Sequence, residues 1–257
     1  MPAALDRVYD TEFEQPFPRS FPKLIMDLTL SAHYRTRRTM RSLFATLLVA
    51  ILFFAPEAIA QDSKAHPDMS FFITSAGPGN GANLGGLEGA DDFCTLLAEA
   101  AGSEGKEWAA YLSAAPTEDS EAIDARDRIG SGPWYNSKGV LIATTVDELH
   151  SDKANLTKEA SIDELGNMVN GRGDSPNTHD ILTGASLEGL FVPGDTDTTC
   201  NNWTNSDEGS ALVGHHDRQG GGTNPTSWNS AHPSRGCSQS NLQASGGNGL
   251  YYCFAKK

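Results

Sequence analysis

The C-terminal segment Gly249-Leu250-Tyr251-Tyr252-Cys253-Phe254-Ala255 decides how the rest of the chain must be arranged, because it is apolar and aromatic along its whole length. Such a run predicts a buried β-strand that needs neighbours on both sides. Before it, the chain from Phe191 onward is rich in Gly, Asn, Ser, Thr and His, with only short apolar interruptions. The predicted regular elements therefore lie at the two ends of the domain, with an irregular region between them.

Residues 89–102 are expected to form a helix. The apolar side chains recur with the i, i+3, i+4, i+7 spacing of one helix face: Phe93, Leu96, Leu97 and Ala100. Cys94 lies beside that face, and Gly102 suits the C-terminal cap. The predicted strands comprise residues 70–75, 108–113, a hairpin of 134–135 with 140–144, and a strand that ends at 181–184.

The first 60 of the 257 residues are interpreted as an upstream extension and a secretory signal. Four arginines precede an apolar run at 43–55, and the small residues Ala58-Ile59-Ala60 predict cleavage after Ala60. The apolar run is too short for a membrane span, which needs about 20 residues. We expect a secreted or periplasmic protein with a polar lead-in at 61–69, one domain at 70–257 and no membrane span after cleavage.

Charge excludes one class of partner. The chain has 19 basic and 33 acidic residues; 7 and 6 of these precede Gln61, which leaves 12 basic and 27 acidic residues in the exported part, a net charge of −15. Such a surface repels phosphate backbones, so sequence-independent binding of nucleic acid is excluded.

All four cysteines lie in the exported part: Cys94, Cys200, Cys237 and Cys253. An even number of cysteines outside the cytosol predicts two disulfides, for which four cysteines allow three pairings. Metal binding is the rival interpretation, but no two of them have the short C-x-x-C spacing of zinc ligands.

Two groups of segments carry a resemblance to a known family. The first helix and following strand of endostatin, a C-terminal domain of certain collagens, are similar to Gly89-Ala90-Asp91-Asp92-Phe93-Cys94 and Trp108-Ala109-Ala110-Tyr111-Leu112-Ser113. Four further segments occur in the same order as in endostatin's closing segment: Cys200-Asn201-Asn202-Trp203-Thr204, Ala211-Leu212-Val213-Gly214, Gly236-Cys237 and Tyr251-Tyr252-Cys253. From Phe71 to Ala255 the chain thus resembles the endostatin-like branch of the C-type lectin-like fold, and secreted bacterial lectin-like proteins of that fold.

The resemblance implies an α+β C-type lectin-like domain with long irregular loops and two nested disulfides, Cys94 with Cys253 and Cys200 with Cys237. It also implies that the loops between Cys200 and Cys237 bind the ligand, a glycan or an extracellular polymer. The side chains expected to contact it are Asn201, Asn202, Trp203, Trp228 and Asn229. Each tryptophan either stacks on a sugar ring or belongs to the core beneath the loops.

Sugar-binding members of this fold hold a calcium ion, and the chain matches that site only in part. No acidic residue flanks Pro225 in Thr223-Asn224-Pro225-Thr226, and Ser230 follows Trp228-Asn229 where the family has a carboxylate. Calcium takes six or more oxygen ligands. Endostatin's zinc ligands come from an N-terminal histidine cluster, of which the chain has His66 alone. We expect no cofactor, with calcium and zinc as alternatives.

His215, His216, Asp217 and His232 are the candidate metal ligands. Adjacent residues on a strand point to opposite faces, so only one of the two neighbouring histidines can readily meet His232 at a single ion. Asp217 or His179 would supply a third ligand. The alternative, which we favour at this point, is that these side chains hydrogen-bond loop carbonyls.

Arg172-Gly173-Asp174 is the tripeptide that integrins recognise, but such short motifs recur by chance, and an integrin is not the expected partner. The favoured function is a secreted, non-catalytic module that binds a carbohydrate or extracellular polymer through the 200–237 loops. The alternatives are a metal-dependent enzyme that uses the histidine cluster, and a structural envelope protein. The chain has no nucleophile elbow, phosphate loop or zinc-protease helix motif, which favours binding over catalysis.

Overall fold

The computed structural model describes residues 64–256. The predicted export signal, with its apolar run at 43–55 and cleavage after Ala60, lies outside the described residues. Packing begins before Ser70, because Ala65 and Met69 of the predicted polar lead-in are buried. Within 64–256, no helix has the length and apolar character that a membrane crossing requires.

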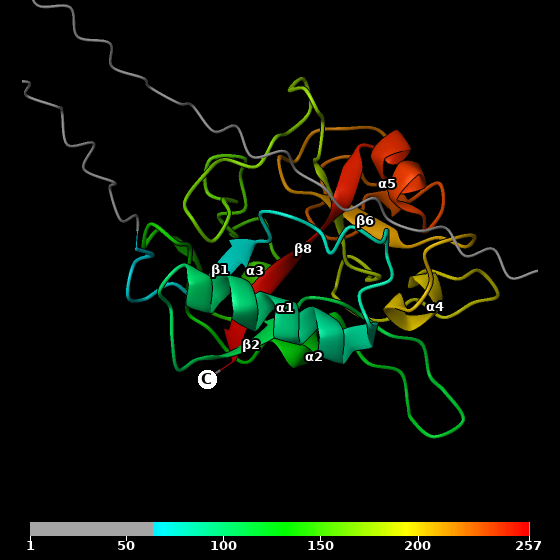
Figure 1. Ribbon diagram of the computed structural model, residues 1–257, viewed down its shortest axis with the longest axis horizontal. Coiled ribbons are helices and arrows are strands. Elements are labelled where there is room, and N and C mark those ends of the chain that lie inside the picture. The colour runs from blue at the N-terminus through cyan, green and yellow to red at the C-terminus, as the bar shows by residue number, and fades with distance from the viewer. Residues whose placement is uncertain (1–63, 257) are drawn as a thin grey trace, which may run out of the picture. The chain divides into compact units, whose positions relative to one another are not determined.

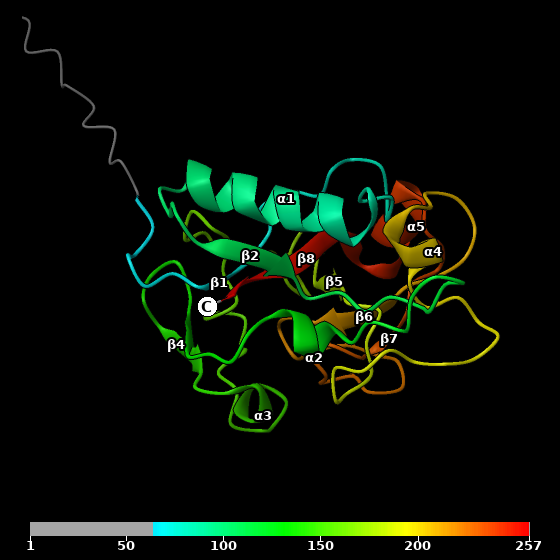
Figure 2. The same cartoon turned by 90° about the horizontal axis from the view of Figure 1, so that it is seen from below.

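The centre of the fold is the C-terminal strand β8 (Gly247–Lys256), drawn in red in Figures 1 and 2. It is hydrogen-bonded to three other strands, antiparallel to the first two and parallel to the third: β1 (Phe71–Ile73), β2 (Glu107–Ala110) and β5 (Asp180–Leu182). The sheet continues from β5 to β6 (Leu212–His215) and β7 (His232–Pro233). The predicted need of this strand for neighbours on both sides is confirmed.

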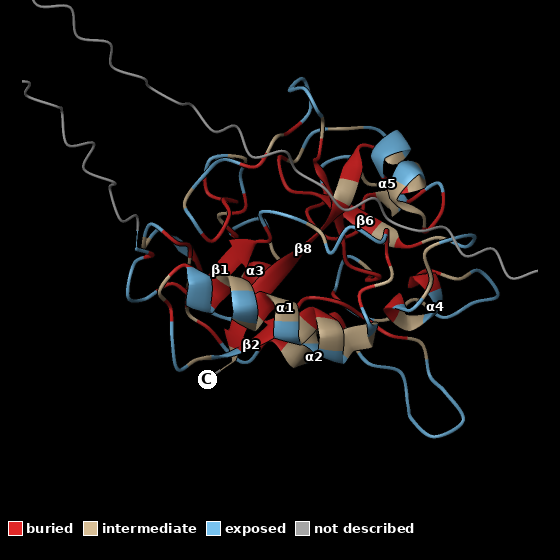
Figure 3. Ribbon diagram, in the orientation of Figure 1, coloured by how far each residue is buried: buried red, intermediate tan, exposed pale blue. Residues whose placement is uncertain are grey.

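Side chains of β8 alternate between two cores. Tyr251 and Cys253 belong to the core on the side of helix α1, whereas Tyr252 and Phe254 belong to a second core that includes Trp134. Because both faces are covered, β8 is buried along nearly its whole length (Figure 3). This explains why the segment carries no polar alternation.

Helix α1 (Gly86–Ala100) lies along one face of the sheet (Figure 2), and its observed orientation corrects a prediction. The buried stripe is Ala90, Cys94 and Ala98, and Leu96 of the predicted apolar face is 60% exposed. Cys94 must face the sheet to bond to Cys253 of β8. The helix is therefore oriented about its axis so that the small side chains of Ala90 and Ala98 lie against the strands.

The remaining elements are short. They are α2 (Ala125–Arg128), β3 (Trp134–Tyr135), β4 (Leu141–Ala143), α3 (Val146–Leu149), α4 (Cys200–Trp203) and α5 (Gln239–Ser245). β3 and β4 form the predicted hairpin. Most of the described chain after β5 runs as loops.

Both disulfides are present. Cys94–Cys253 ties α1 to β8, and Cys200–Cys237 closes the irregular region. The chain is therefore an α+β domain with two disulfides.

Candidate metal centre

Four side chains meet where β5 begins and β6 ends. Asp180 of β5 lies opposite His215 of β6, and His232 of β7 lies opposite Val213 of β6. Directly opposed residues, and residues two apart on one strand, point to the same face, so Asp180, His215 and His232 share a face. His179, the residue before β5, places its ring 4.3 Å from that of His215, centroid to centroid.

Three imidazole nitrogens converge on one carboxylate oxygen. The distances from Asp180 Oδ1 to the Nε2 atoms are 3.2 Å for His179, 3.3 Å for His215 and 3.5 Å for His232. In a tetrahedral zinc site with bonds of about 2.0–2.1 Å, neighbouring ligand atoms are about 3.3–3.4 Å apart. The distances from Asp180 Oδ1 match this spacing, and the ligand atoms of His179, Asp180 and His215 all lie within 4.8 Å of one another. His232 approaches the same carboxylate oxygen but lies outside this mutually close group.

The other ring nitrogen of each histidine is already bound. His215 Nδ1 donates to the carbonyl of Pro225 at 2.8 Å, and His232 Nδ1 to that of Pro233 at 2.9 Å. His179 Nδ1 donates to Asp217 Oδ1 at 3.2 Å. These acceptors place the hydrogen of each neutral ring on Nδ1, so the Nε2 lone pairs are turned toward the carboxylate of Asp180.

Asp180 is buried, with a side chain that is 1% exposed. Neither of its oxygens forms a hydrogen bond within the described residues, and the same holds for Nε2 of the fully buried His215. Burial by itself would raise the pKa of Asp180, and only protonated imidazoles, through hydrogen bonds from His215 and His232 and the positive charge of His232 and His179, would hold that pKa below its usual value. An ionised carboxylate that faces three lone pairs is a strongly favourable place for a cation.

Asp217 supports the centre from behind His179. Its carboxylate accepts hydrogen bonds from His179, from the backbone N–H of Arg172 at 2.5 Å and from that of Gln219 at 3.1 Å. Burial opposes ionisation, but these bonds hold the pKa of Asp217 well below its usual range. A carboxylate on the second nitrogen of a histidine fixes the ring for metal binding.

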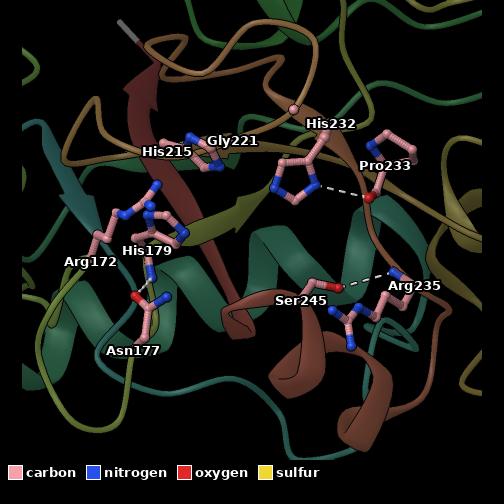
Figure 4. A pocket seen from close by; sticks show the side chains of 10 residues that line it. Arg172, Asn177, His179, His215, Gly221, His232, Pro233, Arg235 and Ser245 are labelled. Carbon is pink, nitrogen blue, oxygen red and sulfur yellow. Dashed lines mark hydrogen bonds between the residues drawn. The ribbon is translucent and has the colours of Figure 1, made fainter.

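The three histidines of the cluster line a pocket of about 500 Å³, whereas Asp180 is not part of its lining. His232, with a side chain that is 21% exposed, is its most accessible member. Figure 4 shows His179, His215 and His232 around this pocket, with Arg172 on the side of His179 and His215 and Arg235 beside Ser245. A metal ion held here could be reached by a small ligand.

The structure changes the predicted ligand set. His215 and His232 come together, as does His179, but His216 points elsewhere and its Nε2 contacts the carbonyl of Asn170 at 3.1 Å. Only one of the adjacent histidines, His215, meets His232, as expected. His216 is turned away from Asp180, and Asp217 contacts Nδ1 of His179 and not the converging Nε2 atoms. Asp180 was not among the predicted ligands, although it directly follows His179 and directly precedes the predicted strand end at 181–184.

Both tryptophans follow the core alternative and are buried. Trp203 is 0% exposed and donates its indole N–H to the Ser113 carbonyl at 2.8 Å. Trp228 is 3% exposed and packs against Tyr111. The two belong to different cores on opposite faces of the sheet, so stacking on a common sugar is ruled out.

The predicted amide contacts are likewise used within the fold. Asn202 binds both the N–H and the carbonyl of Ala115, and Asn229 donates to Tyr111 Oη and to the carbonyls of Ser186 and Leu187. Asn201 has an exposed side chain, bonded to Thr204.

The groups around Pro225 that the calcium alternative would use are also engaged in hydrogen bonds within the fold. Asn224 Nδ2 donates to the Ser230 carbonyl, and the Pro225 carbonyl is occupied by His215. The Arg-Gly-Asp segment is exposed, but the Asp174 carboxylate is paired with Lys158 and accepts from the Gly171 N–H. Neither segment presents a preformed set of free ligand groups.

Comparison with known proteins places the chain in no family: no protein-family model matches it, and no curated protein is significantly similar to it.

Proposed function

We propose that the protein holds one divalent transition metal ion, Zn²⁺ in the first place, at His179, His215, His232 and Asp180. The observation that carries this proposal is the convergence of three Nε2 atoms on one buried carboxylate oxygen while every Nδ1 is hydrogen-bonded. Imidazole ligands with a single carboxylate suit zinc better than calcium or magnesium, which prefer oxygen. The function is that of a metal centre that is accessible from a ligand-sized pocket.

We also propose that this centre is built on a C-type lectin-like domain of the endostatin-like branch in an exported protein. Support comes from the pairing of β1 with β8, the helix tied to β8, and the nesting of the Cys200–Cys237 bridge inside the Cys94–Cys253 bridge. In that fold the 200–237 region carries the ligand. Here this region supplies Gly221, Gly222, His232, Pro233 and Arg235 to the pocket.

The metal-dependent alternative is therefore preferred over a module that stacks sugars on tryptophan, because both tryptophans are core residues. The competing occupant of the cluster is a proton. Asp180 raises the pKa of His232, and a protonated His232 would form a hydrogen bond with the Asp180 carboxylate. The test must therefore distinguish a metal from a proton.

The test is a titration of the purified, chelator-treated protein at neutral pH with Zn²⁺ by calorimetry and with Co²⁺ by absorption. We expect one ion per chain and the intense visible bands of four- or five-coordinate Co²⁺. Zn²⁺ at a hundred times its Kd should stabilise the fold by about 2.7 kcal/mol. A proton alone at the site gives none of these signals.

Asp180→Asn and His232→Ala should abolish stoichiometric binding, because each removes a ligand. His66→Ala, which removes an exposed histidine outside the cluster, and His216→Gln, which changes the neighbour that points away, should bind like the parent. A parent protein that binds no metal, or an Asp180→Asn variant that binds as the parent does, would contradict the proposal.

A further inference from the structure

The charge of the pocket is opposite to that of the domain. From Gln61 onward the chain has 12 basic and 27 acidic residues. The charged residues that line the pocket, apart from histidines, are Arg172 and Arg235 alone, with no acidic residue in the lining formed by the described chain. Two arginines at one concave site of an acidic protein indicate an anionic ligand.

Both arginines are held by their backbones, and both guanidinium groups are free to bind. The Arg172 N–H donates to Asp217, and the Arg235 N–H donates to Ser245 Oγ at 3.0 Å. Within residues 64–256 neither guanidinium takes part in a hydrogen bond or ion pair, and both side chains are exposed. By contrast, Arg126 is paired with Asp147 and Arg128 with Asp91.

The metal centre leaves this positive charge uncompensated. A Zn²⁺ ion balances the carboxylates of Asp180 and Asp217, since the three histidines are neutral when they bind a metal. Arg172 and Arg235 then give the pocket a net positive charge. Within the described residues, no Phe, Tyr or Trp side chain lines the pocket for a neutral sugar to stack on, and the amide and hydroxyl side chains of the lining are those of Asn177 and Ser245.

We infer that the pocket binds a small oxyanion, a carboxylate or phosphate group, between Arg172 and Arg235, with one oxygen directed at the metal ion. This inference rests on the proposed metal centre. The planar guanidinium group presents paired donors that match two oxygens of such a group. An acidic glycan could supply a carboxylate, and free phosphate offers the same chemistry.

The test uses the Co²⁺-loaded full chain. Glucuronate, phosphate and, as the neutral counterpart of glucuronate, glucose are titrated while the Co²⁺ spectrum and the heat of binding are followed. We expect glucuronate or phosphate to shift the spectrum and glucose to leave it unchanged. Tighter binding of glucuronate would identify a carboxylate ligand, and tighter binding of phosphate a phosphate ligand.

Arg172→Gln and Arg235→Gln should each weaken anion binding about tenfold, the effect of losing one charge-assisted hydrogen bond. Neither should change the affinity for Co²⁺ by a comparable factor. Lys153→Gln removes one positive charge at an exposed position outside this pocket and should bind anions like the parent.

The outcomes separate the two proposals. If Co²⁺ does not bind, the metal centre itself is wrong. If Co²⁺ binds but no anion shifts its spectrum, or the arginine variants bind anions as the parent does, the metal centre stands and the oxyanion site is overturned. Equal anion affinity of the metal-free and loaded proteins would also overturn it.

Discussion

At the scale of single residues, each histidine ring of the proposed metal centre has a glycine against it. A Cβ on Gly220 would lie 2.1 Å from His215 Cε1, and one on Gly222 would lie 2.8 Å from His232 Cβ. A Cβ on Gly246 would lie 3.2 Å from His179 Nε2. The high glycine content of the irregular region thus allows the backbone to approach the three rings closely.

Gly220→Ala should therefore weaken metal binding. The new methyl group would push the His215 ring out of position, and such a disturbance around a ligand typically costs about 10- to 100-fold in affinity. Gly221→Ala is the matched control, because a Cβ there meets nothing within 4 Å. Zn²⁺ affinity is measured for both by calorimetry. Equal affinities would show that the close approach to His215 has no part in metal binding.

His150 gives the fold a pH dependence that is separate from the metal centre. Burial lowers the pKa of His150, and the nearby Arg126 adds to this effect; the hydrogen bond from Nδ1 to the Val146 carbonyl and the carboxylates of Asp147 and Glu188 oppose it. The Nε2 atom accepts from Tyr111 Oη at 2.7 Å. As the pH falls below about 6.5, the unfolded chain takes up a proton before the folded protein does, so the free energy of unfolding decreases. This contribution is fully present above pH 6.5 and is lost toward lower pH.

His150→Gln should make the free energy of unfolding less dependent on pH between about pH 7 and pH 5, because Gln keeps an acceptor for Tyr111 but does not titrate. Part of the dependence should persist, since burial also lowers the pKa of His216. Urea denaturation at both pH values provides the measurement, with His66→Gln as control. An unchanged pH dependence in His150→Gln would disprove this role.

At the scale of elements, α4 has an unusual backbone. All four residues from Cys200 to Trp203 have positive φ, between 47° and 64°, which makes this a left-handed turn. Such a conformation costs about 1–2 kcal/mol per residue outside glycine. The turn is held by the Cys200–Cys237 bridge, the indole of Trp203 and the side chain of Asn202 on Ala115. The residues expected to bind a sugar instead stabilise this turn.

Asn202→Ala should lower the free energy of unfolding by about 2 kcal/mol more than Asn201→Ala. Both substitutions place alanine in the left-handed region, with φ of 53° at each position, so this cost cancels in the comparison. Only Asn202 bridges to Ala115, through bonds of 2.7 and 3.1 Å. Chemical denaturation of the two variants measures the difference. Equal losses would mean that the bridge contributes nothing.

At the scale of the whole molecule, the disulfides replace much of what regular structure would provide. Cys94–Cys253 spans a sequence separation of 159 and joins the first helix to the last strand, whereas Cys200–Cys237 spans 37. All four cysteines are fully buried, so the loss of packing on replacement is similar for the two bridges. Their different loop lengths should therefore set the order of their contributions.

The double variant Cys94→Ala/Cys253→Ala should lose about 5 kcal/mol of unfolding free energy, and Cys200→Ala/Cys237→Ala about 4 kcal/mol. The longer loop restricts the unfolded chain more. Urea denaturation under oxidising conditions compares both with the parent. A larger loss for the Cys200–Cys237 pair would show that relief of the strained turn, or another native-state effect, outweighs loop entropy.

Local sequence patterns were sufficient to predict part of the secondary structure. The terminal strand, the helix that contains Cys94 and the hairpin at 134–143 follow from apolar periodicity and turn residues, which act over a few positions. The orientation of α1 did not follow, because the Cys94–Cys253 bond and the close contact of Ala90 and Ala98 with the sheet determine which face is buried.

By itself the sequence determined an α+β domain, its paired cysteines, its acidic charge and a histidine-rich irregular region. Only the tertiary structure decided which histidines lie together, since the register of β5, β6 and β7 brings His215 and His232 to the face of Asp180 from positions 35 and 52 residues further along the chain. It also decided that Trp203 and Trp228 are core residues. Both outcomes depend on contacts between distant segments, to which local composition and periodicity are insensitive.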